Sequence, residues 1–140
     1  MGGTKYFSQG KTAILRSEDY GATFEVIDVS SLWKAHGNGM GRQTGEKLAV
    51  DPKKSDIVLC GTRRDGLFKS TDAGKTWQKI SSIGEASGAD LLNQNGISFV
   101  FFDSTSAATT SGATSVIYMG VSDTTSNLYK STDGGSTWNP

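Results

Sequence analysis

The stretch Ser70-Thr71-Asp72-Ala73-Gly74-Lys75-Thr76-Trp77 decides the fold, because its pattern occurs three times in this chain of 140 residues. The pattern is Ser-x-Asp-x-Gly-x-Thr/Ser-Trp/Phe, and the other copies run from Ser17 to Phe24 and from Ser131 to Trp138. Each copy follows an apolar-rich stretch that ends in a base, which is Arg16, Lys69 or Lys130. Three copies on one background indicate a repeated strand-turn-strand unit.

Each fixed position of the pattern has a physical use in a tight turn. The Ser and Asp side chains can bond backbone N–H groups within the turn. The Gly supplies a backbone position with positive φ at no steric cost. The aromatic residue starts the next strand and can pack back over the turn. We therefore expect structural roles, and not acid or base catalysis, for Ser17, Asp19, Gly21, Phe24, Ser70, Asp72, Gly74, Trp77, Ser131, Asp133, Gly135 and Trp138.

The sequence around the repeats predicts an all-β fold of four-stranded antiparallel meanders, whose strands we denote A to D. Strands are expected at 2–8, 12–17 and 22–29, then at 46–51, 56–62, 66–70 and 75–81, and finally at 96–103, 115–121, 127–131 and 136–138. The low-complexity segment 104–114 is expected to be a flexible, solvated A–B loop.

This pattern is typical of β-propeller blades with the repeated motif, an Asp box, as the C–D turn. We expect one partial domain over 1–140, with a blade remnant at 1–29, a full blade at 46–81 and a nearly full blade at 96–140. Closed propellers have about four to eight blades, so roughly two and three-quarter blades form an incomplete propeller. Its open edges are expected to be covered by missing blades or by self-association.

Composition excludes several classes of function. Basic and acidic residues number 14 each, so the chain lacks the electrostatic footprint of a nucleic-acid or anionic-membrane binder. No apolar run approaches the roughly 18 residues of a membrane span, and no secretion signal is visible at Met1. Cys60 is the only cysteine, which rules out an internal disulfide framework and a cysteine-based zinc site. We expect no cofactor and no metal.

The turns of such a blade lie at two ends. The A–B and C–D turns share the end of the Asp boxes, while the B–C turns and D–A crossovers share the opposite end, where a propeller is expected to bind its ligand. The substrate-binding candidates at that end are Trp33, His36, Arg42, Gln43, Arg63, Arg64 and Asp65. Further loop positions there are Tyr6, Gln9, Lys34, Asn38, Thr44, Asp123 and Asn127.

This mixture of an aromatic ring, amides, arginines and an acid suits a neutral, hydroxyl-rich ligand such as a polysaccharide. The alternative is that each residue is an ordinary loop residue or part of a salt bridge. His36 is the only histidine, so it has no histidine partner for a metal site and is not expected to be catalytic.

Three stretches resemble glycoside hydrolase family 74, a family of xyloglucan-active endo-β-1,4-glucanases and oligoxyloglucan hydrolases. Thr12 to Phe24 is similar to the family's AILRSxDxGATF segment, Gly45 to Pro52 to its GERLAVDP segment, and Ile117 to Trp138 to its IYVGV and YRSTDGGxTW segments. The resemblance implies a secreted enzyme with two seven-bladed propellers that face each other across a polysaccharide cleft.

The resemblance also implies inverting hydrolysis by two aspartates, one from each propeller. The first belongs to an RTDIGGAYRW segment that this sequence lacks, and the second to a propeller that is wholly absent. Asp65 and Asp123 lie at comparable strand ends but in different blades and do not match that motif. We therefore assign no catalytic residue to this chain.

Three functions compete at this point. The first is a fragment of a xyloglucan hydrolase that is inactive alone. The second is a non-catalytic Asp-box segment for protein binding or assembly. A sialidase-like enzyme is disfavoured, because Arg63 and Arg64 are adjacent and point apart on a strand, and no early Arg-Ile-Pro motif is present.

Overall fold

The computed structural model describes residues 11–34, 47–63, 65–83, 96–122 and 126–140. These residues form three antiparallel sheets and no helix, which confirms the all-β prediction. The first sheet contains β1 (Ala13–Arg16) and β2 (Glu25–Asp28). The second contains β3 (Lys47–Val50), β4 (Val58–Gly61), β5 (Leu67–Ser70) and β6 (Gln78–Lys79). The third contains β7 (Ile97–Phe102), β8 (Ile117–Val121) and β9 (Leu128–Ser131).

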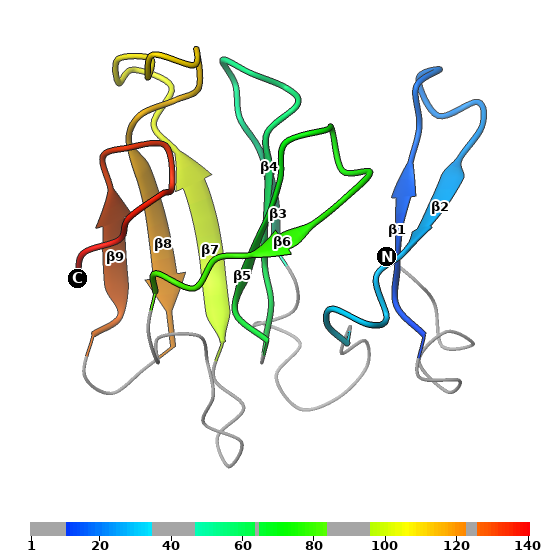
Figure 1. The fold of residues 1–140 in the computed structure, drawn as a ribbon, viewed down its shortest axis with the longest axis horizontal. Coiled ribbons are helices and arrows are strands. Elements are labelled where there is room, and N and C mark those ends of the chain that lie inside the picture. Colours follow the sequence, from blue (N-terminus) through cyan, green and yellow to red (C-terminus); the bar gives the residue numbers. More distant parts are fainter. Residues whose placement is uncertain (1–10, 35–46, 64, 84–95, 123–125) are drawn as a thin grey trace.

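The sheets stand side by side in chain order and do not close into a ring (Figure 1). Within each sheet the strand order follows the sequence, as in an up-and-down meander. The fourth strand of the third sheet is represented only by a bridge between Lys130 and Asn139, one residue beyond the strand expected at 136–138. The strand expected at 2–8 lies outside the described residues. The arrangement is an incomplete β-propeller.

The central strands β4 and β5 of the second sheet are covered on both faces, because their side chains alternate between two neighbouring sheets. Val58, Cys60 and Phe68 join a cluster with Ile14 and other residues of the first sheet. Ile57, Leu59 and Leu67 join a larger cluster with residues of the third sheet: Ile97, Phe102, Ala113, Ile117, Met119, Val121, Tyr129 and Trp138. The core of the molecule is therefore the two layers between adjacent sheets.

Gly61 shows how closely the second and third sheets approach. A Cβ atom at Gly61 would lie 2.4 Å from Cγ2 of Ile97 on β7. Backbone bonds also cross this interface, since the N–H of Ile97 donates to the carbonyl of Thr62 at 3.0 Å. A glycine at the end of the B strand thus makes room for the next blade.

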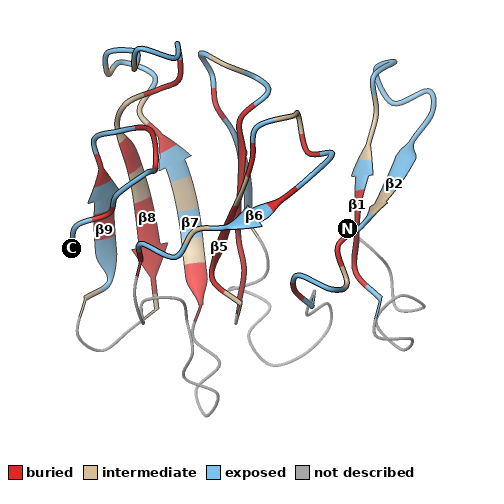
Figure 2. Cartoon of the chain, in the orientation of Figure 1, coloured by how far each residue is buried: buried red, intermediate tan, exposed pale blue. Residues whose placement is uncertain are grey.

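The outer faces of the first and third sheets remain uncovered. Leu15, Phe24 and Val26 are exposed on the first sheet, and Phe99, Phe101 and Leu128 on the third. Figure 2 shows this contrast between exposed residues on β2 and β9 and buried residues along β4 and β8.

The prediction for segment 104–114 was wrong in part. Its end is buried at Ala113 and Thr114, and Ala108 forms a bridge with Thr114. The reason is Asp51, whose carboxylate accepts hydrogen bonds from the backbone and the hydroxyl of Thr114 at 2.8 and 2.6 Å. A polar, low-complexity sequence is thereby anchored to the preceding blade.

Candidate functional site

The three Asp boxes have the same pattern of internal hydrogen bonds. In the second box, Ser70 Oγ accepts from the N–H of Gly74 at 2.8 Å, and the two Asp72 oxygens accept from the N–H and hydroxyl of Thr76 at 2.8 and 2.6 Å. The same bonds recur around Ser17 and Asp19 and around Ser131 and Asp133. In each box the Ser and Asp side chains are therefore hydrogen-bonded within the turn itself.

These bonds hold the box carboxylates ionised. The hydroxyl and N–H of Thr76, followed by the hydroxyl of Ser70, lower the pKa of Asp72 to about 2, and Thr23 does the same for Asp19. At Asp133, burial would raise the pKa, but the bonds from Thr137 and neighbouring groups outweigh it and bring the pKa to about 2. A carboxylate with this pKa is a poor proton donor near neutral pH.

The backbone of each box is left-handed at two successive residues. Position five is Gly21, Gly74 or Gly135, with φ between 85° and 89°. Position four is Tyr20, Ala73 or Gly134, with φ of 58°, 58° and 71°. The aromatic residue closes the turn, because the indole N–H groups of Trp77 and Trp138 donate to the carbonyls of Gly74 and Gly135 at 2.9 and 3.2 Å.

The base before the first and the second box reaches the next sheet. Arg16 Nε donates to the carbonyl of Ala73 at 2.9 Å, and Lys69 Nζ donates to the carbonyl of Gly134 at 2.8 Å. Both acceptors are position four of the following box. The sequence revealed the base as part of the repeat, but not its partner, which lies 57 or 65 residues downstream.

The opposite end of the sheets holds the described part of the predicted substrate site. In Figure 1 the turns β1–β2, β3–β4, β5–β6 and β7–β8 share the Asp-box end, so Lys34, Arg63 and Asp65 lie at the other end. The backbone N–H of Lys34 donates to Asp65 Oδ2 at 3.2 Å, and this bond joins the segment that follows β2 to the β4–β5 turn. Arg63 is buried, Asp65 is half-buried, and Asn127 is exposed.

A tight turn holds Asp65 in place. The N–H of Asp65 donates to the hydroxyl of Thr62 at 2.9 Å, and that hydroxyl donates to the carbonyl of Gly66 at 2.7 Å. The described residues of this end thus combine a fixed carboxylate with the exposed Lys34 side chain. The other candidates lie outside the described residues: His36, Arg42, Gln43 and Arg64, with Tyr6, Gln9, Asn38, Thr44 and Asp123.

The structure places Trp33 in the core, which corrects its prediction as a substrate-binding residue on a loop. Its side chain is only 2% exposed, and its ring centre lies 4.6 Å from that of Phe68 and 5.6 Å from that of Trp77. The cause is the turn after β2, where the N–H groups of Leu32 and Trp33 donate to the carbonyl of Val29. This turn directs the indole into the layer between the first two sheets.

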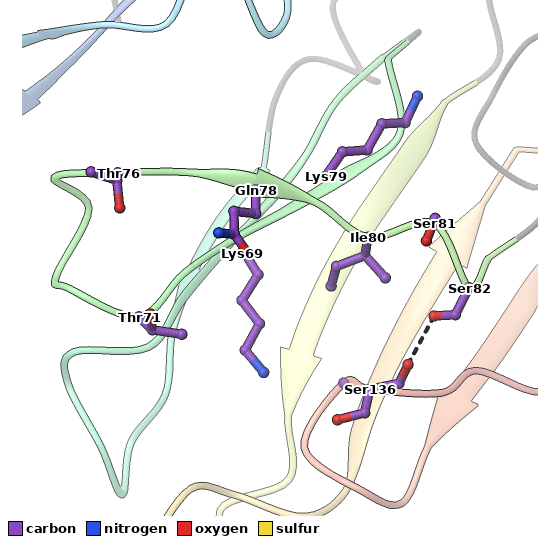
Figure 3. Close-up of a pocket in the computed structure, with 10 residues that line it drawn as sticks. Lys69, Thr71, Thr76, Gln78, Lys79, Ile80, Ser81, Ser82 and Ser136 are labelled. Carbon is purple, nitrogen blue, oxygen red and sulfur yellow. Dashed lines mark hydrogen bonds between the residues drawn. The ribbon is translucent and has the colours of Figure 1, made fainter.

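A polar cavity of about 310 Å³ lies in the groove between the second and third sheets. Figure 3 shows Lys69 extending across this groove toward the loop of Ser136, and Ser82 donating to the Ser136 carbonyl at 2.9 Å. A smaller cavity of about 140 Å³ is lined by Arg16, Glu18, Thr23 and Glu25, the equivalent positions on the first sheet. Because the groove repeats between blades, we interpret it as a product of blade packing.

The described ranges contain no group of three His, Cys, Asp or Glu side chains that could hold a metal ion. They also contain no helix long and apolar enough to cross a membrane. The absence of a cofactor remains a prediction.

The three box turns, the meander order and the side-by-side sheets define the class of protein, which is an Asp-box β-propeller. In agreement, the BNR/Asp-box repeat family matches residues 68–79. Among curated proteins, a xyloglucanase of Hypocrea jecorina is 43% identical over 96% of this chain, and the xyloglucanase Xgh74A of Acetivibrio thermocellus is 42% identical over 90%. This chain spans only 17% and 16% of those two relatives.

Solved structures give the same result. The glycoside hydrolase family 74 enzyme of Niastella koreensis matches 98% of this chain with a TM-score of 0.78 and 50% identity. The family 74 xyloglucanase of Xanthomonas campestris matches 93% with a TM-score of 0.78 and 38% identity. The chain spans 19% of each of these structures. It is therefore homologous, over nearly its whole length, to a segment of the family 74 xyloglucanases.

Proposed function

We propose that this chain supplies propeller blades to an extracellular enzyme that degrades xyloglucan, a β-1,4-glucan with side branches. The observation that carries the proposal is the identity of 37–43% to xyloglucanases over 90–96% of the chain. Because the chain spans about one sixth of those relatives, the activity belongs to a larger protein, of which these blades are scaffold and part of the cleft wall.

The end of the sheets opposite the Asp boxes is the best candidate for the cleft wall. There the Asp65 carboxylate accepts a hydrogen bond from the backbone N–H of Lys34, and the backbone N–H of Asp65 donates to the Thr62 hydroxyl. These two bonds fix Asp65 in place. A fixed carboxylate beside an exposed amine can bond sugar hydroxyls without local rearrangement. At the other end, the Ser, Asp and Thr side chains of the boxes already bond one another.

We propose further that the chain alone does not hydrolyse xyloglucan. Inverting hydrolysis needs two carboxyl groups that flank the scissile bond, one of them protonated to act as the acid. The box aspartates, with pKa values of about 2, are ionised and occupied by their own turns. Asp65 already accepts a hydrogen bond from the backbone N–H of Lys34, and it does not match the family's catalytic motif.

Affinity electrophoresis in gels that contain xyloglucan tests binding, and an assay of released reducing ends tests hydrolysis. The expected result is retardation in xyloglucan gels, none in gels of an α-linked glucan, and no released ends. Equal mobility in all gels would favour the alternative function, an Asp-box segment for protein binding or assembly. Release of reducing ends would overturn the statement that both catalytic acids are absent.

A further inference from the structure

The two grooves between adjacent sheets are built from equivalent positions of the repeat but differ in charge. The smaller groove, between the first and second sheets, is lined by four residues: Arg16, Glu18, Thr23 and Glu25. The four counterparts in the next repeat all line the larger cavity of about 310 Å³: Lys69, Thr71, Thr76 and Gln78. Both walls of the larger cavity, the second and third sheets, belong to the described residues.

The first interface supplies its own counter-ions. Arg16 forms ion pairs with Glu18 and with Glu25, the latter at 3.6 Å. Lys75, from the second box, approaches Glu18 at 3.7 Å. The hydrogen bond and the charge of Arg16 lower the pKa of Glu18, which keeps that carboxylate ionised. Two cations thus face two carboxylates, and the charges at this interface balance.

The larger cavity holds the corresponding base without those partners. Neutral residues stand at the positions that carry Glu18, Glu25 and Lys75 at the first interface: Thr71, Gln78 and Ser136. The Lys69 ammonium donates to a backbone carbonyl of the third box and extends across the groove, whereas Lys79 extends away from it (Figure 3). Lys69 therefore brings a positive charge to a cavity whose facing side chains carry hydroxyl, amide and alkyl groups.

The surroundings of Lys69 disfavour this charge. Burial lowers the pKa of Lys69, and the charges of Asp133 and Asp51 offset only part of that effect. Both of these carboxylates already accept hydrogen bonds from threonine hydroxyl groups. A further carboxylate beside Lys69 would stabilise the ammonium, because an opposite charge nearby favours the charged form.

We propose that the larger cavity binds a sugar acid, such as a hexuronic acid, with the carboxylate of the ligand beside Lys69. This carboxylate takes the place that Glu25 holds beside Arg16, while the Gln78 amide and the Thr71 hydroxyl bind the ligand's hydroxyl groups. The volume lies at the lower end of the roughly 300–1,000 Å³ of ligand pockets, which suits a single sugar unit. The inference rests on the difference between the two grooves and is independent of the proposed action on xyloglucan, which is assigned to the end opposite the Asp boxes.

Titration of the isotopically labelled chain with sodium glucuronate, followed by NMR, tests the site. Saturable shifts are expected at the amides of Lys69, Gln78 and Ser136. Glucose lacks the charge and should bind about tenfold more weakly or less. Acetate lacks the hydroxyl groups and phosphate lacks the carboxylate, so both should also bind more weakly than glucuronate. No saturable shift with glucuronate, or an equal affinity for glucose, acetate or phosphate, would overturn the proposal.

Two variants test the role of charge in the cavity. Lys69→Met removes the ammonium and should weaken glucuronate binding about tenfold. Gln78→Glu changes an exposed side chain and supplies the internal carboxylate that Glu25 gives to Arg16, so it should weaken binding by a similar factor. Lys53→Met is the matched control for lost charge, because Lys53 is an exposed lysine on the β3–β4 turn, and it should bind as the unmodified chain does. Unchanged affinity in Lys69→Met or in Gln78→Glu would contradict a carboxylate site at Lys69.

Discussion

The carboxylate of Asp51, at the end of β3, binds both the backbone N–H and the hydroxyl of Thr114, 63 residues further along the chain. The same carboxylate also accepts from the N–H groups of Lys53 and Lys54 at 2.8 and 3.3 Å. Burial would raise the pKa of Asp51, but the bonds from Thr114 and these N–H groups outweigh it and lower the pKa. One buried residue thus organises its own turn and fastens the next blade.

Loss of the hydrogen bonds between Asp51 and Thr114 should destabilise the fold more than loss of the bonds between Asp103 and Thr105. Hydrogen bonds to a charged group contribute about 1.5–3 kcal/mol, so Asp51→Ala and Thr114→Val should each lower the free energy of unfolding by about that amount. Asp103→Ala is the matched control, because the Asp103 carboxylate accepts hydrogen bonds from the N–H and hydroxyl of Thr105 within its own turn. Urea denaturation compares the variants, and an equal loss for Asp51→Ala and Asp103→Ala would contradict a role between blades.

The stability of the fold should fall in acid over a defined window. The pKa values of Asp19, Asp72 and Asp133 are about 2 in the folded chain and near 4 when unfolded. Their contribution is therefore present above about pH 4 and is lost as the pH falls toward 2. Urea midpoints measured from pH 5 to pH 2 should show this decline. Asp72→Asn should flatten the decline, and an unchanged slope would show that the box bonds do not drive it.

Position four of the boxes offers a test of backbone strain. A left-handed conformation costs an L-residue about 1 kcal/mol or more, so Ala73→Gly should raise the free energy of unfolding by up to about 1 kcal/mol. Gly134→Ala should lower it by about 1–2 kcal/mol, since its Cβ would also lie 3.3 Å from Thr109. Gly112→Ala isolates the strain, because no atom lies within 4 Å of that Cβ. In thermal unfolding, Ala73→Gly should be more stable than the unmodified chain, Gly112→Ala should lose stability from strain alone, and Gly134→Ala should lose the most. Destabilisation by Ala73→Gly would refute the strain at position four.

Trp33 should behave as a core residue. Trp33→Ala should cost about 3–5 kcal/mol, because it opens a cavity beside Phe68 and Trp77. Trp33→Phe should cost much less than Trp33→Ala, since the buried indole N–H has no hydrogen-bond partner in the described structure. Denaturation and xyloglucan affinity measured together separate the roles. If Trp33→Phe kept full stability but abolished binding, the residue would be a ligand platform after all.

The strands and turns could be predicted because their determinants are local. Each box closes within eight residues through its own Ser, Asp and Thr, and its pattern is visible without knowledge of the partner blade. The contacts between blades were not predictable in this way. Arg16, Lys69 and Asp51 each bond a residue 57 to 65 positions away, and nothing in the local pattern names that residue.

The candidate site was predicted less well, for related reasons. Trp33 follows β2 in a polar stretch, so its composition suggested a loop, while its burial depends on the turn at Val29 and on Phe68 from the next sheet. Segment 104–114 likewise appeared to be solvated, because its anchor, Asp51, belongs to another blade. The pairing of Lys34 with Asp65 came from the three-dimensional arrangement alone.

The measurement that tests the account most directly is a titration of the isotopically labelled chain with xyloglucan oligosaccharides, followed by NMR. The account predicts that the largest chemical-shift changes occur at the end opposite the Asp boxes, at Lys34, Asp65, Ser122 and Asn127. The amides of Asp72, Thr76 and Thr137 should not move. The largest changes in the groove lined by Lys69 and Gln78, or at the boxes themselves, would contradict the assignment of the substrate face.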